Sequence, residues 1–199
     1  PGLEFKVEKQ NKKTSIWNNV TTGPPYHFES RDHFRVDVYV TNVGSLANYS
    51  LTIEFTTGVV AFQGVEYWGV FGPGNVSYTP GASVINVNGS GSAWSGSTGL
   101  LCKLTFYVNF TVAPEHIWKY GNTNYATLPI SITDTTLGFG SLGSIPMSGI
   151  TVPSALSIEV DFIRGDLNCD GAVTMADISN VAYYYGQAVP PGPAQYDLN

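Results

Sequence analysis

The chain has 199 residues, of which only 12% are charged, and a formal net charge of −6, which suits one ordinary domain with a small appendage. Its 22 Gly and 12 Tyr, with so few charges, favour a β-rich extracellular or cell-surface protein over a cytosolic enzyme. No basic cluster exceeds Lys12-Lys13, which argues against a nucleic-acid partner, and no apolar run approaches the roughly 18 residues of a membrane span.

Residues 1–21 form an N-terminal strand and tail. Leu3, Phe5 and Val7 alternate with charged residues, and the polar stretch 9–14 follows. Two interpretations stay open. The segment is either the first strand of its own sandwich, or a strand donated to the sheet of a neighbouring copy, in which case these three side chains bind the partner.

Residues 22–163 repeat a period-two alternation of apolar and polar side chains. The alternating stretches are 34–40, 51–56, 102–108, 130–132 and 156–162. Between them lie clusters typical of turns, at 42–44, 72–74, 80–81 and 88–99. Many short, half-buried strands with frequent turns predict an all-β fold of two packed antiparallel sheets.

The sandwich segment offers no recognisable catalytic constellation, so we predict that the protein is not an enzyme. Most of its carboxylates are expected at solvated positions of alternating strands; the carboxylates are Glu29, Asp32, Asp37, Glu54, Glu66, Glu115, Asp134, Glu159 and Asp161. The three histidines, His27, His33 and His116, lie far apart, and none has metal-ligand spacing to a Cys or Asp.

Two sets of residues are relevant to glycans: the tryptophans, as surfaces for sugar rings, and the N-glycosylation sequons. Exposed tryptophans stack on sugar rings, although packing in a core or an interface is the commoner role; the candidates are Trp17, Trp68, Trp94 and Trp118. Five asparagines fit the N-glycosylation rule: Asn19, Asn48, Asn75, Asn88 and Asn109.

The chain has two cysteines. Cys102 shares a strand face with Leu104 and Phe106, which favours a buried small apolar side chain, whereas Cys169 lies in a polar loop. A disulfide between them in an oxidising compartment is the alternative.

The segment 164–199 carries the most specific motif. A twelve-residue loop begins at Asp166 and has Gly171 at position 6, as calcium-binding loops of this length do. Positions 1, 3, 5, 7, 9 and 12 supply the expected Ca2+ ligands, which are Asp166, Asn168, Asp170, the Ala172 carbonyl, Thr174 and Asp177. Val173 is expected to turn inward. An acidic polar turn without a metal is the alternative.

A short helix is predicted after the loop, over 175–185. Ile178, Val181, Ala182 and Tyr185 follow the i, i+3, i+4, i+7 spacing of one apolar helix face, and Gly186 is a C-cap. Beyond a proline-rich connector, residues 196–199 repeat the start of the first loop and stop after its third position. Asp197 and Asn199 would be two ligands of this partial second metal loop.

This loop–helix–linker–loop pattern resembles a truncated type I dockerin, the calcium-dependent module that docks into a cohesin. The resemblance implies that loop positions 10 and 11, here Met175 and Ala176, contribute to the choice of partner. Tyr183 and Tyr184 fall off the apolar helix face, so they either contact a partner or pack on the sandwich.

Residues 34–67 and 99–108 resemble a cohesin, through the stretches "VDVYVTNVGSLANYSLTIEF", "VVAFQGVEY" and "GLLCKLTF". This implies a jelly-roll sandwich whose role is protein–protein docking. We therefore expect a non-catalytic, calcium-binding structural protein at the cell surface that associates head-to-tail with itself, or with a cohesin- or dockerin-type partner. The alternatives are a carbohydrate-binding module or adhesin, and a scaffold component of a secreted enzyme complex.

Overall fold

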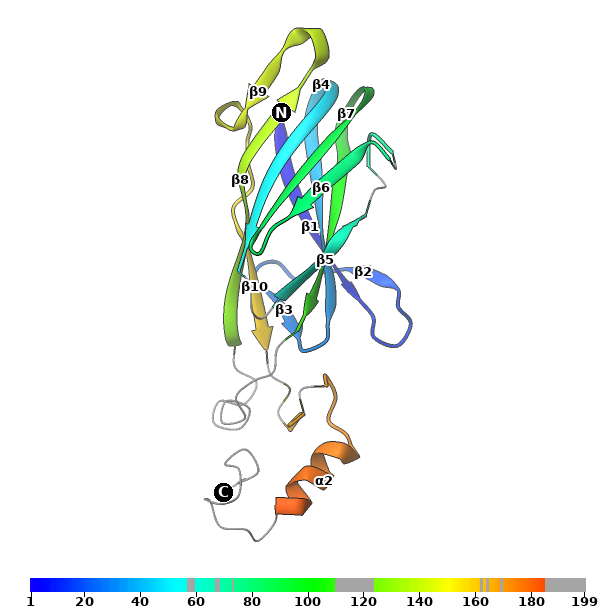
Figure 1. Ribbon diagram of the computed structural model, residues 1–199, viewed down its shortest axis with the longest axis vertical. Helices are drawn as coiled ribbons and strands as arrows, with labels where there is room; N and C mark the ends of the chain where they lie inside the picture. Colours follow the sequence, from blue (N-terminus) through cyan, green and yellow to red (C-terminus); the bar gives the residue numbers. More distant parts are fainter. Residues whose placement is uncertain are drawn as a thin grey trace.

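The computed structural model describes residues 1–56, 60–66, 69–72, 74–109, 124–161, 163, 165–168 and 170–184. Within these ranges the chain is mainly β, as the alternation predicts (Figure 1). The strands are β1 Gly2–Gln10, β2 Trp17–Asn19, β3 Tyr26–Glu29, β4 His33–Phe55, β5 Val60–Glu66, β6 Val76–Pro80, β7 Val84–Val108, β8 Asn124–Gly138, β9 Ser144–Pro146 and β10 Leu156–Asp161. The helices of the described segments are two 3-10 turns, η1 Gly140–Leu142 and η2 Met147–Gly149, and the α-helix α2 Met175–Tyr184.

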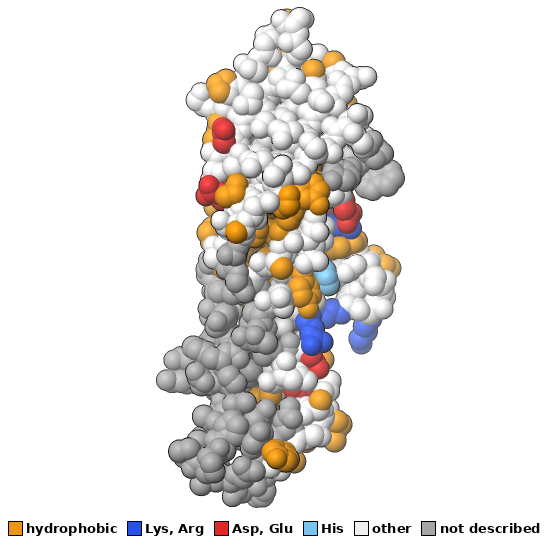
Figure 2. All heavy atoms as spheres, viewed as in Figure 1, with side chains coloured by type: hydrophobic (Ala, Val, Ile, Leu, Met, Phe, Trp, Pro, Cys, Tyr) orange, Lys and Arg blue, Asp and Glu red, His pale blue; other side chains and the backbone are white. Residues whose placement is uncertain are grey.

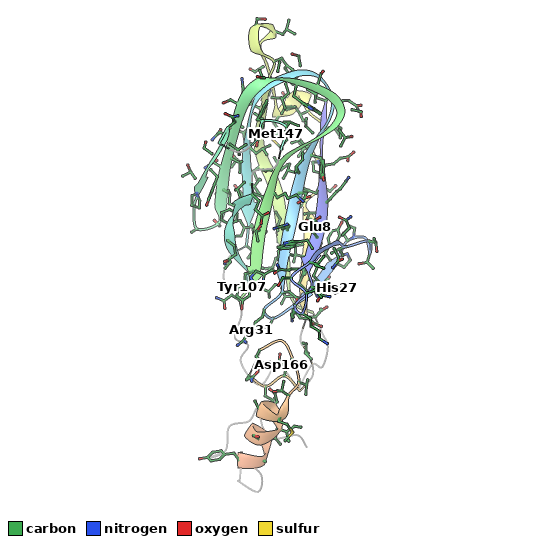
Figure 3. The ribbon with its side chains drawn as sticks, turned by 90° about the vertical axis from the view of Figure 1, so that its right-hand side faces the viewer. Glu8, His27, Arg31, Tyr107, Met147 and Asp166 are labelled. Atoms are coloured by element: carbon green, nitrogen blue, oxygen red, sulfur yellow. The ribbon has the colours of Figure 1, made fainter. Side chains whose placement is uncertain are left out.

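The long strands β4 and β7 form one antiparallel ribbon that is the frame of the fold. Their register runs from His33↔Tyr107 to Glu54↔Val84, with shifts in the 38–48 region. Such bulges bend a strand, and Asn42 adopts a left-handed φ of 54° there. Figure 3 shows both strands arching over one end of the molecule, so each strand serves two layers.

The two layers are completed by the shorter strands. In the first layer, residues 34–41 of β4 pair with β1, and residues 103–108 of β7 pair with β5. In the second layer, residues 48–55 of β4 pair with β8, and β6 joins the other edge of β7. β10 and then β3 extend the second layer beyond β8. The two-sheet sandwich is as predicted, except that β3 and β10 pair in parallel.

The core lies between these layers, because apolar side chains of both meet there. Phe55 of the second layer contacts Phe106 of the first edge-on, with ring centroids 5.4 Å apart. Phe28 of β3 stacks on Phe34 of the first layer at 4.4 Å. The Tyr49 hydroxyl donates a hydrogen bond across the sandwich to the Leu101 carbonyl, at 2.9 Å. Burial of these rings is the main source of stability.

Two of the predicted turn clusters are wrong. Residues 42–44 and 88–99 do not end strands but lie inside β4 and β7. In the second of these segments the small residues make room for rings instead: an added Cβ at Gly89 would collide with the Tyr49 ring, and one at Gly99 would meet the Trp94 indole. The other two predicted clusters do lie outside strand interiors: Gly72 and Gly74 have positive φ between β5 and β6, and β6 ends at Pro80.

The N-terminal segment belongs to the sandwich of its own chain. β1 pairs with β4 over eight residues, from Gly2↔Thr41 to Lys9↔Phe34, and with β2 on its other edge. Leu3 and Val7 are buried in the core, and Phe5 is half-buried against it. No described helix is long and apolar enough to cross a membrane.

Candidate calcium-binding loop

The predicted metal loop lies beyond the end of β10 and leads into α2. Its turns need glycine at two places, because Gly165 has φ 92° and Gly171 has φ 84°. Gly171 is also confined, since an added Cβ would lie 2.7 Å from the Ser30 carbonyl oxygen. The segment thus coils tightly where the sequence predicts the sharp turn.

Asp166 and Asp177, positions 1 and 12, are both buried in this loop. Asp166 Oδ1 accepts a hydrogen bond from the Asp170 N–H at 2.9 Å, and its Oδ2 accepts one from the Gly171 N–H at 2.7 Å. Asp177 Oδ1 accepts from the Leu167 N–H at 2.9 Å, and its Oδ2 from the Thr174 N–H at 2.8 Å. The Asp177 carboxylate therefore ties the end of the loop to Leu167 near its beginning, and the Asp166 carboxylate closes its first turn.

The other predicted ligands line the turn between them. Asn168 Oδ1 accepts from the Asp170 N–H at 2.9 Å, and Asp170 Oδ1 accepts from the Ala172 N–H at 3.1 Å. The Thr174 hydroxyl donates to Asp177 Oδ2 at 3.2 Å. All five side-chain ligand positions thus belong to one hydrogen-bonded loop. Oxygen donors in this number and order suit a hard cation such as Ca2+.

The electrostatics of the loop also favour a cation. Burial raises the pKa of Asp166, and the nearby charges of Asp170 and Asp177 raise it further, against the backbone hydrogen bonds that lower it. Burial would raise the pKa of Asp177 as well, but hydrogen bonds from Thr174, Asn168 and Leu167 lower it below its usual value. Three carboxylates this close repel one another, and a bound divalent ion relieves that repulsion.

Lys12 connects the loop to the sandwich. Its Nζ donates to the Ser30 carbonyl at 3.0 Å and approaches the Gly171 carbonyl at 3.5 Å. The same ammonium pairs with Asp32 Oδ1 at 3.2 Å, and Lys9 pairs with Asp32 Oδ2 at 2.6 Å. Figure 2 shows basic side chains gathered between the sandwich and the helical end. Asp32 is fully buried, so the expectation of a solvated carboxylate is wrong for it.

Helix α2 exposes much of its apolar surface. Met175 is 70% exposed, Ile178 54% and Tyr183 73%, while Val181 is half-buried against the core cluster. Ala176 is exposed as well. Val173 is 53% exposed, so the prediction that it turns inward is wrong, although it lies against Gly165. The side chain of Tyr184, and Tyr185, Asp197 and Asn199, lie outside the described residues.

The side chains of β1 that strand donation would place in a partner lie in the sandwich of their own chain. Leu3 and Val7 face the core of their own chain, where β1 completes the first layer. This is the first of the two arrangements considered for residues 1–21. In it, these side chains are not available to a second molecule.

All five sequon asparagines are exposed. Asn48, Asn75 and Asn88 line one groove of about 440 Å³ on the outer side of the second layer, between β4, β6 and β7. Side chains with hydroxyl groups also line the groove, among them Ser50, Ser77, Ser90 and Thr136. Figure 2 shows few charged side chains on the upper half of the face it presents.

The tryptophan platform is not supported by the described residues. Trp17 is half-buried, with the Arg35 guanidinium 3.7 Å from its ring centroid, and Trp94 packs against the core. Trp68 and Trp118 lie outside the described residues. Cys102 is fully buried, as predicted, and burial raises the pKa of its thiol. Cys169, and with it the alternative of a disulfide, also lies outside them.

Sequence spacing missed two groups of charged residues. Asp37 is buried, and its Oδ2 accepts a hydrogen bond from Lys103 Nζ at 2.8 Å. His27 lies beside Glu159 and Asp161, with ligand atoms of all three within 4.8 Å of one another. These residues are more than 130 positions apart, so only the β3–β10 pairing brings them together.

Comparison with known proteins adds information on the fold. No protein-family model matches the chain, and neither does any curated protein. Solved structures do match. A type I cohesin–dockerin complex from Clostridium thermocellum has 15% identity and a TM-score of 0.56, and the match covers 69% of this chain and 90% of that chain.

Two further structures agree with it. Another type I cohesin–dockerin complex from Clostridium thermocellum has 12% identity and a TM-score of 0.54, with 82% of this chain and 100% of that chain covered. The sixth cohesin of scaffoldin B from Acetivibrio cellulolyticus, in complex with a dockerin, has 10% identity and a TM-score of 0.52, covering 81% and 99%. At these identities the likeness concerns the fold alone. The sandwich has a cohesin-like fold, as predicted.

Proposed function

We propose that this chain is a non-catalytic, calcium-binding structural protein of the cell surface, in which the segment 165–184 docks onto the sandwich of another copy. One observation carries the proposal: a loop rich in carboxylates leads directly into a helix that exposes several large apolar side chains to solvent. Met175, Ile178 and Tyr183 lie at one end of the elongated molecule, away from the core (Figure 1).

The cohesin-like fold supports the sandwich as the receiving surface. The matching structures named above are complexes of cohesins with dockerins. Here both parts would stand in one chain. Because the two contact surfaces differ, docking between copies is heterologous, and heterologous contacts that do not close into rings build filaments.

The residues of the loop have a defined part in this assembly. Bound Ca2+ would supply the positive charge that three aspartates need. Asp166 fixes the first turn of the loop by accepting from the Gly171 N–H, and Asp177 fixes the last turn by accepting from the Thr174 N–H. The helix begins at Met175, two residues before Asp177, so order in the loop fixes the direction of the exposed apolar side chains.

Donation of the strand β1 is the other route to such an assembly. It would require Leu3 and Val7 to leave the core of their own chain and enter that of a neighbour. The exposed face of α2 needs no such rearrangement. Docking of α2 is therefore the route that we favour.

The test is the size of the full chain in solution, measured by light scattering and by electron microscopy, with and without Ca2+. We expect polymers in Ca2+ and smaller species in excess EDTA. Ile178→Ser should reduce polymerisation strongly in Ca2+, because it removes an exposed apolar side chain of α2. Leu142→Ser is the matched control, since Leu142 is 81% exposed at the opposite end. A particle size that changes neither on removal of Ca2+ nor in Ile178→Ser would overturn the proposal.

One observation favours carbohydrate binding as the alternative. The groove beside Asn48, Asn75 and Asn88 presents uncharged amides and hydroxyls, which suit the hydroxyl groups of a sugar. Binding on a glycan array that is lost in Asn88→Ala, and independent of Ca2+, would support this function over assembly.

A further inference from the structure

A second cluster of metal-ligating side chains lies on the outer face of the second layer. β3 and β10 run parallel there, and their register places His27 opposite Glu159. Because alternate residues of a strand share a face, Glu159 and Asp161 project together on the side opposite to the buried Ile158 and Val160. The backbone ladder thus fixes three potential ligands on one surface.

The distances within this cluster suit a small ion. His27 Nδ1 lies 2.8 Å from Asp161 Oδ2 and 3.6 Å from Glu159 Oε2. A tetrahedral Zn2+ with ligands at about 2.0–2.1 Å holds those ligand atoms about 3.3 Å apart. The two nitrogen–oxygen distances lie on either side of that value, so small side-chain movements suffice to accept the ion.

The charge of the cluster is also suited to a cation. Among the described residues, His27 is the only ion-pair partner of Glu159 and Asp161, so two carboxylates share one imidazole. The carboxylate side chains are about one-fifth exposed, at 20% and 23%, and the imidazole 53%, so an ion can reach them from solvent.

The ligand types separate this cluster from the calcium loop. Ca2+ prefers six or more oxygen ligands, whereas an imidazole nitrogen with carboxylates suits Zn2+ and neighbouring transition metals. None of the three residues belongs to the loop between Asp166 and Asp177.

We propose that His27, Glu159 and Asp161 form a second metal site, which takes Zn2+ or a similar divalent transition-metal ion. Three protein ligands leave one coordination position to water. The ion links β3 to β10 across the four-residue parallel pairing at this edge of the sheet. Figure 3 shows His27 at the end of the sandwich that is closer to Asp166.

The test uses the full chain with Ca2+ in excess, so that the calcium loop is filled before the second metal is added. Titration with Co2+ should give one tight equivalent with the visible absorption of a low-symmetry site. His27→Gln and Asp161→Asn should each weaken Co2+ binding by at least about tenfold, as the loss of a metal ligand does. Zn2+ at a hundredfold excess over its dissociation constant should raise the melting temperature by about 5–10 °C.

His33→Gln is the matched control, because the His33 ring packs at a tilt against Tyr107 and has no part in the cluster. It should bind Co2+ as the unaltered chain does. The variants must melt like the unaltered chain in EDTA, which separates lost ligation from lost folding. Equal Co2+ affinity in His27→Gln and the unaltered chain, or no binding in either, would overturn the proposal. If neither protein binds Co2+, the cluster is only an ion pair between His27 and the two carboxylates.

Discussion

The two buried aspartates of the loop, Asp166 and Asp177, have pKa values shifted in opposite directions. Burial and neighbouring charges dominate at Asp166 and raise its pKa, whereas backbone hydrogen bonds dominate at Asp177 and lower it. The spacing of the oxygen-bearing residues predicted where the loop would coil. It could not predict these opposite shifts, because they depend on which N–H groups each carboxylate meets after folding.

Replacement of a loop carboxylate should weaken calcium binding. Asp177→Asn removes a charge at position 12 and an acceptor that holds the Leu167 and Thr174 N–H groups. We expect the calcium affinity, measured by isothermal titration, to fall by at least about tenfold. Asp134→Asn, at an exposed site of β8, should leave it unchanged. An unchanged affinity in Asp177→Asn would mean that the loop is not the calcium site.

The buried pair of Asp37 and Lys103 should make stability depend on pH. Burial raises the pKa of Asp37 above its usual value, although Lys103 opposes the shift. The folded chain then holds this proton more tightly than the unfolded chain. The contribution of Asp37 to stability is therefore greatest below its unfolded pKa and is lost as the pH rises through the folded pKa.

Lys103→Met exposes this dependence, because it leaves the buried Asp37 carboxylate without its partner. We expect a loss of about 3–5 kcal/mol in the free energy of unfolding at pH 7, measured by denaturant titration. The loss should shrink as the pH falls through the pKa of Asp37. Lys6→Met, which removes an exposed ammonium above the Tyr39 ring, should cost less than about 1 kcal/mol. Equal losses in the two variants would contradict this account.

At the scale of elements, the bent ribbon of β4 and β7 is the feature that the sequence predicted least well. Glycine and serine runs are typical of turns, and residues 88–99 hold many of them. In the structure the same small residues lie within β7, under the rings of Tyr49 and Trp94. Local composition predicts backbone freedom, but a distant side chain decides whether that freedom makes a turn or a close contact.

Glycine substitutions in the ribbon test this explanation. Gly89→Ala should destabilise the sandwich by about 1–3 kcal/mol, because the new Cβ collides with the Tyr49 ring and would disturb its hydrogen bond to Leu101. Gly44→Ala is the control in the same ribbon, since nothing lies within 4 Å of its Cβ position. Denaturant titration should show a clear loss in the first variant only. Similar losses in both would indicate a backbone effect rather than a collision.

At the scale of the molecule, the sandwich and the helical end have different sources of order. The sandwich buries a continuous core, to which the loop adds Leu167, whereas the loop and α2 expose most of their other apolar side chains. Alternation predicted the first part, and motif spacing predicted the second. Neither predicted that Lys12, from the turn after β1, would reach the loop at Gly171, because that contact joins positions 159 residues apart.

Removal of calcium should therefore loosen one end only. In EDTA we expect a protease to cleave within 165–184 while the sandwich stays intact, because the loop would lose the cation that offsets its carboxylates. Mass spectrometry of the products over time measures this. Addition of Ca2+ should restore protection. Cleavage that begins in the sandwich, or at equal rates with and without Ca2+, would contradict the separation.

The shared ribbon has a mechanical consequence. Since the backbones of β4 and β7 run through both layers, neither layer can unfold while the other stays folded. Unfolding of the sandwich should be a single cooperative event, visible as one calorimetric transition. In the head-to-tail assembly proposed above, a sandwich under tension would then keep both layers or lose both together.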